Sequence, residues 1–302
     1  MFSELIGMNR LKTVFIFLLL GFMFTSSSVL RVDYREGRYN NVCKDLRNDV
    51  LLYFIFIDTK ETSPWTEFDI MSTIDSLGVA TRWLEKQAQQ NKIDLKIKTD
   101  YYIGNEYATV NQNLPEESVE KSLLEPNLKK GINALNKWAD NVSRKAGESF
   151  YIVDKDGIPK TQPPKDTERL IAHLRDEYSV ESVALMFMVN NYFRSDLSVA
   201  LNTMTNEDVE FAIVSYKYPS VIAHNFLHLY GAADLHDTPF RRSGRKIKLA
   251  KKLYPQGIMQ DPYSKNINEL IISDFSRYLI GWTDEVDPDF EELLTDRMFS
   301  FH

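Results

Sequence analysis

Residues 219–236 read PSVIAHNFLHLYGAADLH, and they contain three of the five histidines in the chain. Pro219 suits the first turn of a helix, because its ring fixes a helical φ and its missing N–H would have no partner there. Gly231 suits the left-handed residue that follows a helix. Between them His224 and His228 stand four apart, so their imidazoles project from one face about one turn apart. The spacing therefore predicts a helix that presents two imidazoles side by side.

Two neutral imidazoles in this arrangement can bind one metal ion, most often zinc. Gly231 lets the chain reverse and bring a third ligand to the same ion, and Asp234 stands at a suitable distance along it. His236 is the alternative third ligand. The competing interpretation is a buried amphipathic helix whose two histidines are only core or capping residues.

The full pattern, His-x-x-x-His-x-x-Gly-x-x-Asp, resembles the zinc-binding consensus of the metzincin-like metallopeptidases, in the variant whose third ligand is Asp. Downstream, GIMQ at residues 257–260 resembles the Met-turn of that family. The resemblance implies an α+β, zincin/metzincin-like fold, with a twisted mixed sheet, long packed helices and a small C-terminal subdomain. It also implies zinc as the cofactor, with His224, His228 and Asp234 as ligands and Met259 as an apolar floor beneath the metal.

One residue departs from the family pattern. The active enzymes carry Glu after the first His, where it takes the proton from the zinc-bound water that attacks the peptide carbonyl, and this chain carries Asn225. Asn can hydrogen-bond a water molecule but cannot accept its proton. Loss of general acid–base catalysis lowers a rate by about 10²–10⁴-fold. The resemblance thus implies a metallopeptidase-like protein with weak or no turnover, in which Asn225→Glu is expected to raise the rate.

Two residues after the Met-turn are candidates for an assisting role. Asp261 is the nearest carboxylate by sequence that could replace the missing base, and Tyr263 could donate a hydrogen bond. One alternative function is a non-catalytic zinc-binding or peptide-binding protein on the same scaffold. Another is a structural envelope protein with a coincidental motif. For the metallopeptidase-like protein and for the non-catalytic binding protein, the expected partner is a peptide or protein, as substrate or ligand.

The N-terminus has the layout of an export signal. Arg10 and Lys12 precede an apolar run at 14–24, and small residues follow at 25–28. We expect residues 1–28 to be a signal peptide of a secreted or periplasmic protein; the alternative is an uncleaved membrane anchor formed by residues 11–28. Residues 29–302 are expected to form one metallopeptidase-like domain, with an upper part to about residue 230 and a lower part over 231–302. The net charge of −7 argues against a nucleic-acid partner.

Hydrophobic patterning places the other elements. The apolar run 50–57 predicts a strand buried on both faces, and Ser63-Pro64 predicts the start of a helix that ends near residue 90, with Phe68 and Met71 on its inner face. Alternation over 93–98 predicts a half-exposed strand. We also expect helices at 128–147, 170–178 and 267–280, a short strand at 150–153 and a turn at 154–157. Strands are expected at 183–189 and 209–216, either of which would be the sheet edge along which a peptide lies.

A basic segment lies between the candidate third ligand and the Met-turn. Residues 241–252 include seven Lys and Arg in a chain that is acidic overall. A solvated loop or helix face is the first interpretation of such a run. The alternative is a docking surface for an acidic peptide or an anionic envelope.

Overall fold

The computed structural model describes residues 31–40, 43, 45–103, 109–115, 128–148, 165–190, 198–201, 209–215, 218–236, 244–263 and 265–297. Over these residues the chain is a mixed α/β protein with a mixed sheet and packed helices, as the sequence predicts at that level. The expected signal peptide or anchor at 1–28, the strand at 150–153 and the turn at 154–157 lie outside the described residues.

The main sheet is built around β2 (Asn48–Asp58). In the described part of the chain its strand order is β3 (Leu95–Tyr102), β2, β5 (Ser182–Val189), β7 (Phe211–Val214) and β6 (Ser198–Leu201), and β4 (Val110–Asn111) pairs with the end of β2. Among the described strands of this sheet, β6 and β7 pair antiparallel and the other pairings are parallel.

Both faces of β2 are buried, which confirms the strand predicted at 50–57. Residues 50, 52, 54 and 56 belong to one hydrophobic core and residues 51, 53, 55 and 57 to another. The alternation follows from the pleat, because successive side chains of a strand point to opposite faces. The sheet therefore separates two cores, and each needs a layer of helices to cover it.

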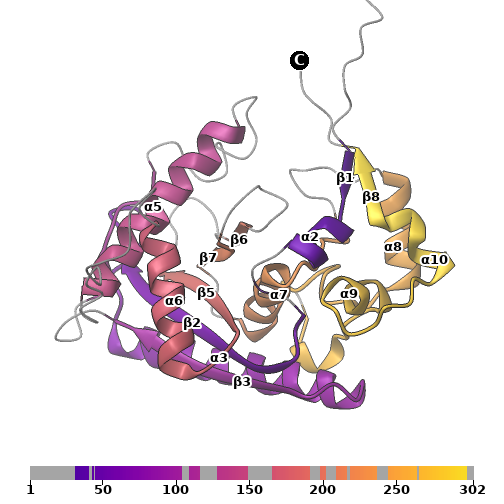
Figure 1. Cartoon of the computed structure of the whole chain (residues 1–302), viewed down its shortest axis with the longest axis horizontal. Helices are drawn as coiled ribbons and strands as arrows, with labels where there is room; N and C mark the ends of the chain where they lie inside the picture. The colour runs from indigo at the N-terminus through magenta and orange to yellow at the C-terminus, as the bar shows by residue number, and fades with distance from the viewer. Residues whose placement is uncertain are drawn as a thin grey trace, which may run out of the picture.

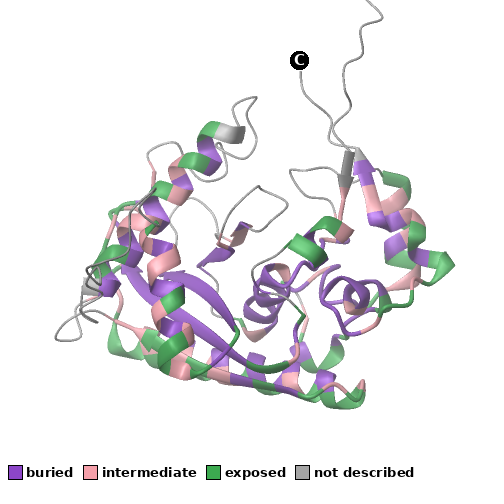
Figure 2. Cartoon of the chain, viewed as in Figure 1, coloured by how far each residue is buried: buried purple, intermediate pink, exposed green. Residues whose placement is uncertain are grey.

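Two pairs of helices supply these layers (Figure 1). The first core receives side chains from α3 (Glu67–Gln90) and α7 (Pro219–Leu229), and the second receives them from α5 (Leu128–Glu148) and α6 (Asp166–Tyr178). Figure 2 shows β2, β5 and α7 as almost continuously buried, whereas α3 alternates between buried and exposed residues. The helix with the two histidines is therefore an interior element.

The start of α3 differs from the prediction. The helix begins at Glu67, and its N-cap is Thr66, whose hydroxyl accepts a hydrogen bond from the backbone N–H of Asp69, so Ser63-Pro64 is not the cap. Phe68 is 79% exposed and Met71 is 53% exposed, so their assignment to the inner face is wrong. At about 3.6 residues per turn, Phe68 lies roughly opposite the buried Leu77, nine residues later.

The edge of the sheet is also not where the sequence predicts it. The strands expected at 183–189 and 209–216 do form, as β5 and the shorter β7, but β5 lies between β2 and β7 and β7 lies between β5 and β6. The edge beside α7 is the antiparallel β6. With four residues, of which three are half-buried, β6 carries no alternation that could predict it.

The C-terminal part contains short elements rather than the predicted helix over 267–280. They are α8 (Gly244–Leu253), η3 (Ile267–Glu269), α9 (Asp274–Leu279), α10 (Pro288–Glu291), η4 (Glu292–Leu294) and β8 (Thr295–Arg297). The predicted helix is interrupted because Ile271 forms a bridge with Gly257 and Ser273 caps a new helix. Gly281, with φ of 79°, follows α9.

Segments from the beginning and end of the chain meet in this part. The strand β1 (Arg31–Asp33) pairs antiparallel with β8, and the short helix α2 (Arg35–Asn40) contacts α9. Figure 1 shows α8, α9 and α10 together on the right of the view, beside β1 and β8. No helix in the described ranges combines the length and the apolar character that a membrane span requires.

The described part of the basic segment, residues 244–252, lies in α8, where carboxylates of the C-terminal segment contact two of its cations. Arg245 lies 2.7 Å from a carboxylate oxygen of Glu292, and Lys246 lies 3.5 Å from one of Asp296. Lys248, Lys251 and Lys252 are exposed. The docking surface stays a prediction, and residues 241–243 lie outside the described part.

Candidate metal centre

The helix α7 positions the first two candidate ligands. Pro219 is in its first turn and Gly231, with φ of 93°, lies just beyond its end, as the sequence predicts. His224 is 3% exposed, and its ring centroid lies 4.5 Å from that of His228. Their two Nε2 atoms are 3.0 Å apart. The local pattern thus gives a helix with both imidazoles directed to one point.

The turn after α7 brings two more side chains to this point. The backbone N–H of Ala232 donates to Leu227 O at 3.0 Å, so the chain reverses directly after the helix. Asp234 Oδ1 then lies 3.1 Å from His228 Nε2 and 3.3 Å from His224 Nε2. His236 Nε2 lies 3.1 Å from the same oxygen. Both alternatives for the third ligand are therefore present in one cluster.

Backbone carbonyls orient the two helical imidazoles. His224 Nδ1 lies 3.2 Å from the carbonyl oxygen of Ile258, and His228 Nδ1 lies 2.7 Å from that of Ala232. Because a carbonyl can only accept, each Nδ1 must carry the proton and donate it. In the neutral imidazole each Nε2 then presents a lone pair to the cluster. This orientation is the one that metal-binding histidines adopt in proteins.

The electrostatics favour a neutral imidazole at His224 and an ionised carboxylate at Asp234. Burial lowers the pKa of His224, the charge of His228 lowers it further, and Asp234 only partly opposes this. For Asp234, burial alone would raise the pKa, but His228 and the other two imidazoles around the carboxylate lower it well below its usual value. These are the protonation states in which His and Asp bind a metal ion.

The spacing of the ligand atoms fits a zinc ion. In a tetrahedral site with bonds of about 2.0–2.1 Å, the ligand atoms are about 3.3 Å from one another. The three distances among His224 Nε2, His228 Nε2 and Asp234 Oδ1 are 3.0, 3.1 and 3.3 Å. The ligand atoms of His224, Asp234 and His236 all lie within 4.8 Å of one another. The nitrogen and oxygen donors are also of the type that zinc prefers.

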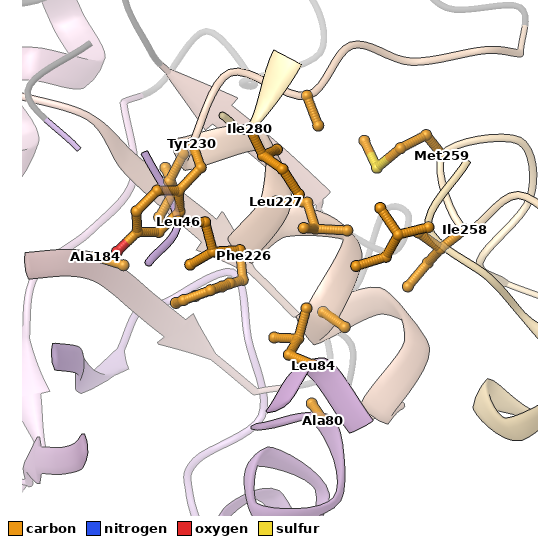
Figure 3. Packing of buried hydrophobic residues seen from close by; sticks show 14 of the residues in the cluster. Leu46, Ala80, Leu84, Ala184, Phe226, Leu227, Tyr230, Ile258, Met259 and Ile280 are labelled. Carbon is orange, nitrogen blue, oxygen red and sulfur yellow. The ribbon is translucent and has the colours of Figure 1, made fainter. Parts of the chain in front are cut away.

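The predicted Met-turn forms a turn next to the cluster. The backbone N–H of Gln260 donates to Gly257 O at 2.9 Å, and Met259 is fully buried. Figure 3 shows Met259 and Ile258 beside Leu227 of α7. The carbonyl of Met259 accepts from the backbone N–H of Leu235 at 2.8 Å. The turn therefore holds the residue between Asp234 and His236 in place.

Asn225 faces the sheet edge rather than a solvent-filled space. It is 1% exposed, and its Nδ2 donates to Ser198 Oγ at 2.8 Å and to Val221 O at 2.9 Å. Both amide hydrogens are thus used to attach α7 to β6. Sequence reasoning did not identify Ser198, because it lies 27 residues away and no local pattern signals the pairing.

The two candidate assisting residues follow the Met-turn. Asp261 Oδ1 accepts the backbone N–H of Tyr263 at 3.1 Å, so this carboxylate stabilises the local chain. The ring of Tyr263 lies 6.5 Å from that of His224 and is 40% exposed. Tyr263 is therefore a neighbour of the cluster.

The chain matches none of the known family models, and no curated protein matches it either. Any inference about its function therefore rests on the geometry of the four side chains.

Proposed function

We propose that this chain is a metzincin-like zinc protein in which His224, His228 and Asp234 bind the metal. The observation that carries the proposal is the meeting of two imidazole lone pairs and one carboxylate oxygen at 3.0–3.3 Å. Three acceptors at this distance repel one another unless a cation lies between them. A second proton, on His224 Nε2, is disfavoured because burial lowers the pKa of His224. A divalent metal ion between the three acceptor atoms would remove this repulsion.

The arrangement around the cluster supports the zincin/metzincin-like assignment. A strand–helix–strand unit opens the main sheet, and an antiparallel edge strand, β6, lies beside the helix that carries both histidines. The turn with Met259 follows the candidate ligands in sequence and is attached to them by hydrogen bonds. Ser220 Oγ adds a bond to Pro262 O at 2.6 Å, which ties the start of α7 to the same segment.

The expected chemistry is peptide-bond hydrolysis at a strongly reduced rate. Bound zinc would polarise a peptide carbonyl and lower the pKa of a water molecule. Asn225 supplies no proton acceptor for that water, and its amide hydrogens are directed to Ser198 and Val221. Weak or absent turnover follows from this chain's own residues.

A second candidate function is capture of a peptide without cleavage. Among the described strands β6 pairs only with β7, and an extended peptide could add along its other edge. Because Ser198 of β6 also bonds Asn225, this edge lies directly beside the proposed metal site. The expected peptide would be extended and would bind next to the zinc.

Cleavage of casein and of peptide libraries tests the proposal. The unaltered protein is expected to cleave poorly, and Asn225→Glu is expected to raise the rate wherever a water molecule can bind the zinc, up to the 10²–10⁴-fold range of general acid–base catalysis. The gain should disappear with a chelator and with the added Asp234→Ala substitution. Robust chelator-sensitive cleavage by the unaltered protein would contradict the role given to Asn225. Peptide binding without cleavage in either form would favour the second function.

A further inference from the structure

His236 joins the cluster in addition to the three candidate ligands rather than in place of one. Its Nε2 lies 3.1 Å from Asp234 Oδ1, and its ring centroid lies 6.1 Å from that of His224. The position is well defined, because Leu235 between them is fully buried and its backbone N–H donates to Met259 O. Asp234 and His236 are thus held on either side of an anchored residue.

We propose that His236 is a fourth zinc ligand and that it closes the site. The inference rests on the zinc site proposed above and goes beyond it. Zinc sites that serve catalysis keep one position open for water or substrate, whereas sites with four protein ligands are structural. Asp234 Oδ1 lies 3.1–3.3 Å from all three imidazole Nε2 atoms, and the ligand atoms of His224, Asp234 and His236 lie within 4.8 Å of one another, so His236 is within reach of an ion bound at Asp234.

A closed site agrees with the loss of the general base. With His236 in the fourth position no metal-bound water has to be deprotonated, so Asn225 is free to serve another purpose. Its bonds to Ser198 and Val221 serve to attach α7 to β6. Zinc would then link α7 to the segment after Gly231, as a cross-link inside the fold.

The test compares the full-length protein with His236→Ala after loading with Co²⁺, whose visible spectrum reports its ligands. Acetohydroxamate is the probe, because it binds a metal ion only where a position is open. We expect it to leave the spectrum of the unaltered protein unchanged and to shift that of His236→Ala. His236→Asn serves as a second, polar variant, and His173→Ala, a change of a histidine on α6, serves as the matched control.

Zinc affinity gives an independent readout. Loss of a direct ligand is expected to weaken zinc binding by at least about 100-fold, the upper end of the effect of partners outside the coordination sphere. His173→Ala should bind zinc as the unaltered protein does. In the Asn225→Glu background, added His236→Ala is expected to raise cleavage, because it opens the position for the water molecule that the Glu would deprotonate.

The outcomes separate the two proposals. A shift of the Co²⁺ spectrum by acetohydroxamate in the unaltered protein would overturn the closed site and leave His236 as a residue that only positions Asp234. Equal zinc affinity of His236→Ala and the unaltered protein would overturn it as well. Absence of any Co²⁺ or Zn²⁺ binding in the unaltered protein would overturn the zinc site itself and with it the role of His236.

Discussion

Ser198 and Asn225 form a side-chain contact that sequence patterns do not signal. Replacement of Ser198 by Ala removes the hydroxyl that accepts from Asn225 Nδ2. A buried donor without a partner costs about 1–3 kcal/mol, so we expect Ser198→Ala to lower the free energy of unfolding by that amount in urea titrations. Ser198→Thr keeps a hydroxyl and is the control. Equal stability of the Ala variant and the unaltered protein would show that the contact does not attach α7 to β6.

Cys43, the only cysteine of the chain, is 1% exposed and its Sγ lies 3.2 Å from Val183 O. Burial raises its pKa well above the usual value, and nearby Glu210 raises it further. A raised pKa lowers the thiolate fraction at neutral pH, and the thiolate is the reactive form. We therefore expect iodoacetamide to label the thiol only after denaturation, as measured by mass spectrometry. Rapid labelling of the folded protein would contradict this burial.

At the scale of elements, the Met259 turn carries a clear expectation for stability. Met259 is fully buried in the core shared with α7. Met259→Ala leaves a cavity and should cost about 2–5 kcal/mol, whereas Met259→Leu conserves volume and should cost less than about 1.5 kcal/mol. Chemical unfolding of the two variants provides the measurement. Similar losses for both would mean that the side chain is not packed as Figure 3 shows.

The elements that the sequence predicts well are those with a local signal. The helix α7 has Pro219 at its start, Gly231 beyond its end and both histidines between, and the four side chains of the cluster fall within 13 residues. Elements set by distant contacts were missed. The bridge between Gly257 and Ile271 breaks the helix predicted at 267–280, and β6 depends on its pairing with β7. Periodicity contains no information on either contact.

At the scale of the whole molecule, a zinc ion would join segments on both sides of Gly231, and both contribute to one core. Zinc that binds the folded state alone stabilises it by about 2.7 kcal/mol at a concentration 100 times the Kd. We expect added zinc to raise the melting temperature of the unaltered protein and of His173→Ala. His224→Ala should show a much smaller shift. An equal shift in His224→Ala would place the stabilising ion elsewhere.

The central claim is that His224, His228 and Asp234 bind zinc. Native mass spectrometry of the full-length protein, unaltered and as Asp234→Ala, measures this directly. The account predicts one zinc ion per chain in the unaltered protein after exposure to zinc and removal of loosely bound metal, with most of it lost in Asp234→Ala. A chain that retains no zinc under these conditions, or an Asp234→Ala variant that retains it fully, would contradict the claim.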